Sequence, residues 1–237
     1  ISKNKKPNLK PLINATTLIA NYIKKNSLII YESTVFPGCT ENFCVPILEK
    51  ISKLKNKKDF DCGYSPERIN VGDKKHTLKN IKKIVSASSP QALKTIKLIY
   101  NSCIKAGVFV AESIKVAEAA KVIENSQRDL NIAFVNELSI IFRKLNLNTE
   151  SVLEAASSKW NFLKFEPGLV GGHCIGVDPY YLTFKSKKHG YNPKVISSGR
   201  LINDYMPKFI VKKLIKYLKK NKIKFKNYKI LIMGMSF

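Results

Sequence analysis

The alternation of apolar and polar residues predicts helices and strands in turn over the first third of the chain. Residues 11–25 carry apolar side chains at helical spacing, and a second helix is predicted for residues 40–54. Short runs rich in β-branched and aromatic residues predict strands at 27–31, 60–64 and 81–86. Strands that alternate with helices indicate parallel α/β layering, so we predict the back half of a doubly wound, Rossmann-like domain.

A long helix is predicted for the centre of the chain. Residues 111–145 contain few helix breakers, and their apolar positions form a broad helical stripe. At 1.5 Å per residue, such a helix is about 50 Å long. Because its apolar residues are not confined to one side, we expect it to pair with another subunit. Shorter helices are predicted for residues 148–157 and 193–205.

The C-terminal part is predicted to form an amphipathic helix and then a strand. Lysines interleave with apolar residues over 212–229, which is typical of a helix with a solvated lysine face, and residues 228–237 resemble a buried strand that enters a glycine turn. No G-x-G-x-x-G, the motif that binds a dinucleotide pyrophosphate, follows a strand in this sequence. We expect three parts, residues 1–108, 109–207 and 208–237, in a fragment that lacks both outer segments.

Composition narrows the classes of function. The 42 Lys and Arg residues outnumber the 17 Asp and Glu residues, which gives a formal net charge of +25. Only four of the basic residues are arginines, the usual residues for gripping phosphates and reading bases, so nucleic-acid binding is the weaker interpretation. The five cysteines form no C-x-x-C pair, which argues against a disulfide framework or a zinc site and favours the cytoplasm. No apolar run approaches the ~20 residues of a membrane span.

A lone cysteine follows two glycines in the segment from Gly171 to Tyr181. Glycine lets a ligand approach the backbone closely, and a thiol reacts as its thiolate. If the chain turns helical after the glycines, Cys174 and Asp178 share one helix face, and Asp178 can hold a water molecule beside the sulfur. On these residues alone, a small buried thiol in a glycine-rich turn is an equally good interpretation.

Four other positions have the residue types that catalysis needs. Lys121 and Asn125 are four residues apart on the long predicted helix and together can stabilise an oxyanion, although residue types alone favour a surface lysine. Glu67 follows a proline at a strand end and suits a general base; the alternative is a surface pair with Arg68. Thr34 follows the first predicted strand, where α/β folds place ligand groups, and is equally well interpreted as a turn residue.

Five segments resemble the UDP-glucose/GDP-mannose dehydrogenase family and follow its order. They are residues 31–38, 64–70, 115–131, 159–168 and 171–181. The resemblance is strongest to the branch that oxidises N-acetylated UDP-hexosamines. It implies part of an NAD-binding domain, then a central helical domain for dimerisation and catalysis, and then the first strand of a second Rossmann-like domain, which binds UDP.

The resemblance also implies roles for individual residues. The expected catalytic residues are Cys174, Lys121, Asn125, Asp178, Glu67 and Thr34. The expected NAD contacts are Thr34, Glu32 and Cys174. The expected UDP-sugar contacts are Glu67, Arg68, Lys121, Asn125, Leu163, Phe165 and Gly171. No metal is expected, His173 is assigned to scaffolding, and a homodimer is expected to form through helix 111–145.

The expected reaction is the four-electron oxidation of the C6 hydroxyl of a UDP-N-acetylhexosamine to the uronic acid, for surface polysaccharide synthesis. One hydride transfer cannot convert a primary alcohol into an acid, so two NAD+ are needed. Cys174 is expected to retain the aldehyde as a thiohemiacetal and then as a thioester. UDP-glucose and UDP-N-acetylmannosamine are alternative substrates, and an inactive dimerisation module is the non-enzymatic alternative. We expect the 237 residues alone to be inactive because they contain no pyrophosphate loop.

Overall fold

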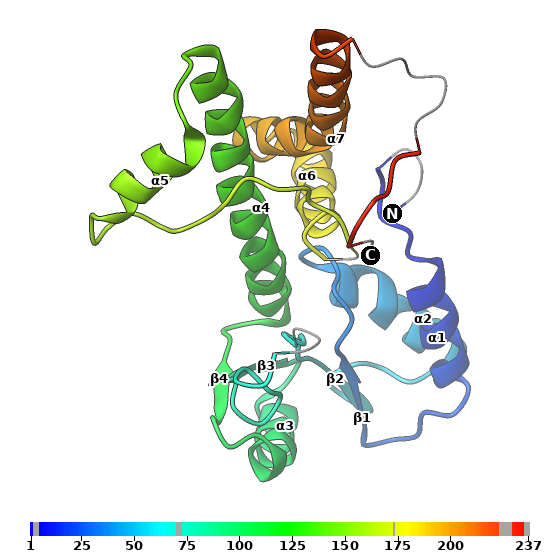
Figure 1. Ribbon diagram of the computed structural model, residues 1–237. Coiled ribbons are helices and arrows are strands. Elements are labelled where there is room, and N and C mark those ends of the chain that lie inside the picture. The colour runs from blue at the N-terminus through cyan, green and yellow to red at the C-terminus, as the bar shows by residue number, and fades with distance from the viewer. Residues whose placement is uncertain (2–4, 70–72, 173, 223–228, 235–237) are drawn as a thin grey trace. The chain divides into compact units, whose positions relative to one another are not determined.

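The computed structural model describes residues 1, 5–69, 73–172, 174–222 and 229–234 (Figure 1). The chain forms two compact units. The first unit comprises Ile1–Glu124 and Tyr180–His189, and the second comprises Asn125–Pro179 and Gly190–Phe237. The long helix α4 (Ile114–Lys144) begins in the first unit and ends in the second. Among the described residues, no helix has both the length and the apolar character that crossing a bilayer requires.

The first unit contains a sheet of four strands. Their order in the sheet is β1 (Ser27–Tyr31), β2 (Phe60–Tyr64), β3 (Lys83–Ala87) and β4 (Val108–Val110). β1 and β2 are parallel, as are β3 and β4, but β2 and β3 are antiparallel with Gly63 opposite Ala87. The predicted parallel layering is therefore wrong for the central pair of strands, because side-chain alternation indicates which residues share a face and not the direction of the neighbouring strand.

Helices cover both faces of this sheet (Figure 1). Cys62 of β2 is buried in one core with Leu48 of α2 (Val45–Ser52) and Ala20 of α1 (Lys10–Ala20). The next residue, Gly63, faces the other way, since an added Cβ there would lie 2.3 Å from Cδ1 of Ile96 in α3 (Pro90–Cys103). Successive strand residues point to opposite faces, so α1 and α2 pack on one face and α3 on the other.

The second unit is helical. It contains the C-terminal part of α4, α5 (Thr149–Ser157) and α7 (Lys194–Lys220). α4 and α7 approach closely at Gly199, where an added Cβ would lie 2.5 Å from Cδ2 of Leu130. α7 changes direction along its length (Figure 1), and Pro207 within the helix explains the bend because proline removes one helical hydrogen bond.

Most of the predicted elements are present, with shifted ends. β1 and β2 have the predicted bounds, and α4 confirms the long helix. The predicted helix 40–54 begins with a π-helical segment, η1 (Thr40–Cys44), before α2. The helices α3 and α6 (Asp178–Lys188) and the strand β4 were not predicted.

The C-terminal predictions are only partly correct. α7 ends at Lys220, earlier than the predicted lysine-rich helix. Residues 229–234 contain no helix or strand, and Leu231 and Met233 are 82% and 85% exposed. A buried strand forms only where neighbouring chain covers its side chains and pairs with its backbone groups, and the exposure of 229–234 means that the described residues do not cover this segment. The other residues of both predictions, 223–228 and 235–237, lie outside the described part of the chain.

Candidate functional site

The segment with the lone cysteine forms a turn that leads into α6. Gly172 has a positive φ of 79°, which favours glycine at this position, and a Cβ added at Gly171 would meet no atom within 4 Å. The Cys174 thiol is free and exposed, which excludes the buried-thiol interpretation. Because α6 begins at Asp178, Cys174 lies just before the first residue of this helix. The Asp178 N–H donates to the Cys174 carbonyl at 2.9 Å, so one turn of backbone separates them.

A buried hydrogen bond joins two of the predicted catalytic residues. Nδ2 of Asn125, on α4, donates to Oδ2 of Asp178 at 2.6 Å. Both side chains are buried, and hydrogen bonds to a carboxylate are stronger than those between neutral groups. The second unit therefore brings Asn125 together with Asp178 and the backbone of Cys174, three of the expected catalytic residues.

Lys121 lies on α4 one turn before Asn125 and is also buried, with 5% of its surface exposed. The structure thus excludes the surface-lysine interpretation. Burying an ammonium is costly unless charged or polar groups compensate it, so a buried lysine is unusual and needs such groups around it.

The first unit places acidic residues where β1 and β2 end. Glu32 follows β1 and Glu67 follows β2, and the ammonium of Lys83 contacts both, at 3.1 Å from Glu32 Oε1 and 2.8 Å from Glu67 Oε2. Burial opposes ionisation of Glu32, but hydrogen bonds from Tyr100 and Lys83 outweigh it and lower the pKa of Glu32. Thr34 is half-buried in the segment after β1, where the Tyr64 hydroxyl donates to the Ser33 carbonyl at 3.1 Å.

Arg68 does not pair with Glu67 through its side chain. Its Nε lies 3.4 Å from Oε2 of Glu124, while its backbone N–H donates to Oε1 of Glu67 at 2.6 Å. The alternative of a surface pair between Glu67 and Arg68 is therefore wrong.

The expected sugar-contact segment lies in the second unit. Leu163 is exposed there, Phe165 is half-buried and Gly171 is exposed. His173, which was assigned to scaffolding, lies outside the described residues.

Glu118 has a supporting role that the sequence did not reveal. This buried residue of α4 accepts hydrogen bonds from the backbone N–H groups of Gly38 and Thr40, the latter at 2.8 Å. It thereby holds the turn that follows Thr34. Burial raises the pKa of Glu118 even though both hydrogen bonds favour its charged form. An acidic residue among alanines in an apolar stripe was the available signal.

Asn136 supports the predicted substrate segment in the second unit. Its Nδ2 donates to the carbonyl of Gly168 at 2.9 Å, and its Oδ1 accepts the N–H of Gly168 at 2.8 Å. The same Nδ2 donates to Asn203, which in turn donates to Asp129. This two-way bond fixes Gly168 to α4 through a side chain that has both a donor and an acceptor.

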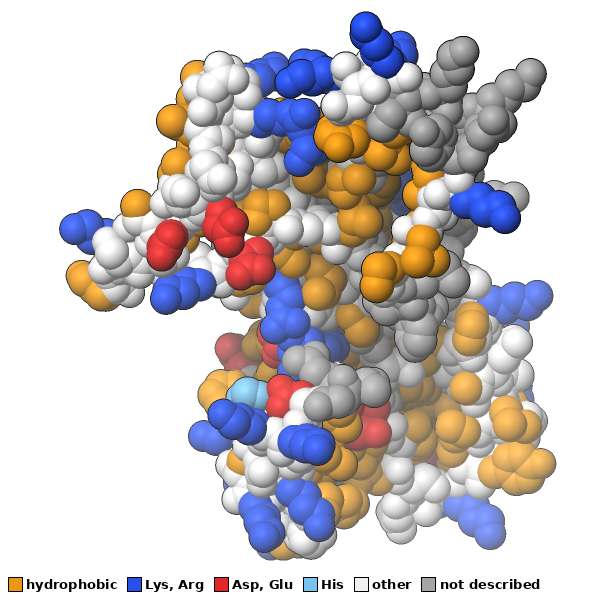
Figure 2. Space-filling view, viewed as in Figure 1, with side chains coloured by type: hydrophobic (Ala, Val, Ile, Leu, Met, Phe, Trp, Pro, Cys, Tyr) orange, Lys and Arg blue, Asp and Glu red, His pale blue; other side chains and the backbone are white. Residues whose placement is uncertain are grey.

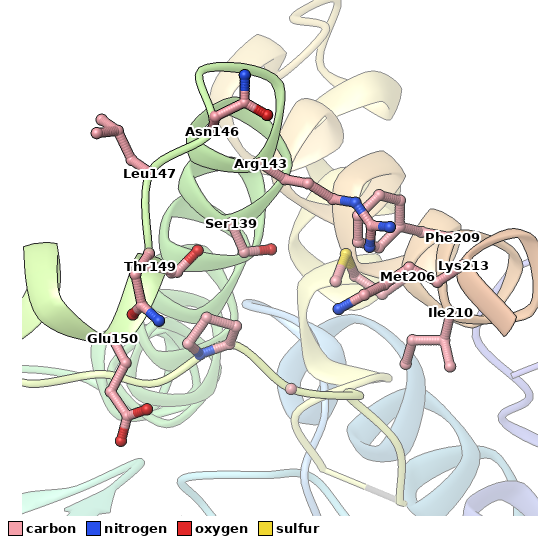
Figure 3. Close-up of a pocket in the computed structure, with 13 residues that line it drawn as sticks. Ser139, Arg143, Asn146, Leu147, Thr149, Glu150, Met206, Phe209, Ile210 and Lys213 are labelled. Atoms are coloured by element: carbon pink, nitrogen blue, oxygen red, sulfur yellow. The ribbon is translucent and has the colours of Figure 1, made fainter. Parts of the chain in front are cut away.

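The second unit also contains a cavity of about 750 Å³ (Figure 3). Arg143 and Ser139 from α4, Met206 and Phe209 from α7, and Glu150 from the start of α5 line it, together with eight further residues. Neither Cys174, Asn125 nor Asp178 lines this cavity, whereas Phe165 borders a neighbouring one of about 640 Å³. The cavity volumes therefore do not indicate where the predicted chemistry takes place.

The charged side chains of the described residues bear on metal and nucleic-acid binding. On the face shown in Figure 2, lysines and arginines are dispersed among uncharged side chains. In the described part of the chain, no cluster of three or more His, Cys, Asp or Glu residues could hold a metal ion. That the protein binds no nucleic acid and no metal remains a prediction.

Comparison with known protein families identifies the chain. Residues 1–104 match the NAD binding domain of the UDP-glucose/GDP-mannose dehydrogenase family, and residues 115–205 match the central domain of the same family. The chain belongs to the UDP-glucose/GDP-mannose dehydrogenase family. The resemblance noted in the sequence is confirmed, and so is the mixed α/β fold with its Rossmann-like NAD domain.

Individual family members are similar along the whole chain. The UDP-N-acetyl-D-glucosamine 6-dehydrogenase of Salmonella typhi is 56% identical over all 237 residues, and Protein CapL of Staphylococcus aureus is 53% identical over the same length. The chain spans 56% of the length of each of these relatives. Among solved structures, a UDP-D-ManNAc dehydrogenase from Pyrococcus horikoshii matches 94% of this chain and 52% of its own, with 31% identity and a TM-score of 0.86.

Proposed function

We propose that this chain carries part of the active site of an NAD-dependent enzyme that oxidises the C6 hydroxyl of a UDP-N-acetylhexosamine to the uronic acid. The 56% identity to a UDP-N-acetyl-D-glucosamine 6-dehydrogenase supports this substrate class. The structural observation that carries the proposal is the buried bond between Asn125 and Asp178, one turn after an exposed free cysteine. UDP-glucose and UDP-N-acetylmannosamine are the alternative substrates within the family.

The ends of the strands suit one part of a dinucleotide site. Ligands of parallel α/β sheets bind beyond the carboxyl ends of the strands, and Glu32 and Thr34 both follow the carboxyl end of β1, which is parallel to β2. The Glu32 side chain is half-exposed at this edge. We assign NAD contacts to Glu32, Thr34 and Cys174. When bound, NAD+ supplies the acceptor for a hydride in each of two oxidations.

The residues of this chain account for the covalent part of the reaction. The Cys174 sulfur adds to the C6 aldehyde, and Lys121 and Asn125 stabilise the charge on the C6 oxygen. With NAD+ bound to accept the second hydride, C6 would become a thioester. A water held by Asp178 and Thr34 then attacks C6, Glu67 takes a proton from it, and the C6–S bond breaks with its electron pair going to sulfur. Arg68, Leu163, Phe165 and Gly171 are assigned to UDP-sugar binding.

We also propose the divisions 1–108, 109–207 and 208–237 as parts of the NAD, central and UDP-binding domains, and a homodimer formed through α4. Four large apolar side chains of α4 are exposed: Val116, Ile123, Phe134 and Ile141. Their spacing of 7, 11 and 7 residues places them within about 20° of one line along a helix with 3.6 residues per turn. Exposed apolar residues aligned along one side of a helix favour an interaction surface. Sedimentation of the protein as a monomer at micromolar concentration would contradict this assignment.

The proposed location is the cytoplasm. All five cysteines are free thiols, and three of them are buried in the first unit. Free thiols persist in reducing compartments, whereas oxidising compartments favour disulfides.

The decisive experiment compares Cys174→Ser with the wild type in the full-length protein. NADH and uronic acid are measured with UDP-GlcNAc, UDP-GalNAc, UDP-ManNAc and UDP-glucose. We expect uronic acid formation by the variant to fall by about 10³-fold or more, as for other enzymes that lose a covalent nucleophile. Cys103→Ser is the matched control, since Cys103 is also exposed but lies on α3. Full uronic acid output from Cys174→Ser would refute the proposal.

A second candidate is an inactive dimerisation module. It is favoured by the exposed stripe of α4. We expect the 237 residues alone to produce no NADH with any of these sugars. Turnover by this chain would exclude the module.

A further inference from the structure

Lys83 connects the two acidic residues that follow β1 and β2. Its side chain is only 4% exposed, whereas Glu67 and Glu32 are 37% and 50% exposed. Its ammonium contacts both carboxylates and lies 3.4 Å from the Pro66 carbonyl, with the Tyr100 ring centroid 5.1 Å away. The cation is thus buried beneath two carboxylates that face solvent.

The antiparallel pairing of β2 and β3 produces this arrangement. Tyr64 is opposite Ser86, so three more residues in each direction bring Glu67 level with Lys83. The parallel pair β1 and β2 places Tyr31 opposite Tyr64, which brings Glu32 to the same edge. Lysine is rarely buried in proteins, and removing its charge from water is costly unless carboxylates and carbonyls compensate it.

These contacts fix the Glu67 carboxylate at both oxygens. Oε2 bonds Lys83 at 2.8 Å, and Oε1 accepts the Arg68 N–H at 2.6 Å. Lys83 is itself held by Glu32, whose Oε1 accepts the Tyr100 hydroxyl at 2.6 Å. A chain of contacts from Tyr100 through Glu32 and Lys83 therefore sets the orientation of Glu67.

We propose that Lys83 is a positioning residue for thioester hydrolysis and acts through Glu67. This inference rests on the proposed function, in which Glu67 takes a proton from the attacking water. A general base contributes only when it is aligned with the proton that it removes, typically by about 10²–10⁴-fold. Without its ammonium partner, the carboxylate is free to adopt other rotamers, and hydrolysis slows while the preceding oxidations do not.

The test is a double-mutant cycle in the full-length protein with K83M, E67Q and the double variant. Stopped-flow NADH measurements with UDP-GlcNAc separate the first turnover from steady state. For K83M we expect a burst of about two NADH per site, followed by a steady-state rate that is about 10–100-fold below wild type. K83R keeps the charge and is expected to restore most of the rate. K94M, at an exposed lysine of α3, is the control.

In the E67Q background, K83M is expected to cause no further loss, because its effect passes through Glu67. The same fold-loss in both backgrounds would overturn the inference, as would wild-type turnover of K83M or of E67Q. If K83M and K83R both lose burst and steady state together with a lower Tm, Lys83 only supports the fold. A wild-type protein that makes no NADH with any UDP-sugar would overturn the proposed function, and this inference with it.

Discussion

Replacing Arg200 with methionine removes a buried cation from the second unit. The guanidinium is 7% exposed and bridges Asp129, which is fully buried, to the partly exposed Asp204. Asp129 also accepts a hydrogen bond from Asn203 at 2.8 Å. Methionine fills a similar volume but donates no hydrogen bond, so Asn203 is the remaining side-chain donor to Asp129 that this structure shows.

Breaking a buried ion pair by removing one partner typically costs about 3–5 kcal/mol, because the other charge stays buried without its counterion. This cost is a large fraction of the about 5–15 kcal/mol that stabilises a typical domain. With a urea m-value of about 2–3 kcal/mol/M, the denaturation midpoint of R200M should fall by about 1–2 M. Because Asp129 lies on α4 and Arg200 on α7, the substitution weakens the contact between these two helices.

The cost should depend on pH in a defined direction. Burial raises the pKa of Asp129, an effect that Arg200 partly offsets, and removing Arg200 raises this pKa further. A group with a raised native pKa contributes stability below its unfolded value and loses it as the pH rises through the native value. The deficit of R200M is therefore largest at neutral pH and shrinks as the pH falls toward 4.

The assay is urea denaturation followed by circular dichroism at 222 nm, at neutral and acidic pH. D129N/R200M, which removes both charges, should recover most of the loss. R143M is the matched control, since Arg143 is exposed and its Cζ lies 6.0 Å from the centroid of the Phe209 ring. This substitution should lower the free energy of unfolding by less than about 1 kcal/mol. A loss below about 1 kcal/mol for R200M, unchanged with pH, would refute the reasoning.

Three further substitutions test local packing and hydrogen bonding. Gly63→Ala should lower the free energy of unfolding by about 1–3 kcal/mol, because the new Cβ would lie 2.3 Å from Ile96 and 3.0 Å from the Ser86 carbonyl. Gly168→Ala is the control and should be near neutral, since open space surrounds its new Cβ. Equal urea midpoints for the two variants would contradict this prediction. Asn136→Asp keeps the acceptor for the Gly168 N–H but loses the donor to the Gly168 carbonyl. Amide hydrogen exchange at Gly168 should therefore accelerate by roughly 10-fold or more. Wild-type protection of this amide would refute the proposed role of Asn136.

The local sequence pattern was sufficient to locate an element or a candidate residue where a segment has a strong hydrophobic period or a distinctive motif. Short runs rich in β-branched and aromatic residues located β1 and β2, and the helical stripe located α4. Glycine spacing located Cys174 and Asp178, and the motif on α4 located Lys121 and Asn125. These features depend on residues close together in the chain, so a short window of sequence is enough to recognise them.

Only the tertiary structure decided how the polar residues are partnered. The bond between Asn125 and Asp178 spans 53 residues, and the ion pair between Arg200 and Asp129 spans 71. Lys83 meets Glu67 because β3 runs antiparallel to β2, a direction that residue alternation does not encode. The sequence by itself determined most of the helices, most of the strands and the chemical groups available. Folding decided which of those groups are buried and paired, because burial and charge pairing depend on neighbours that are distant in sequence.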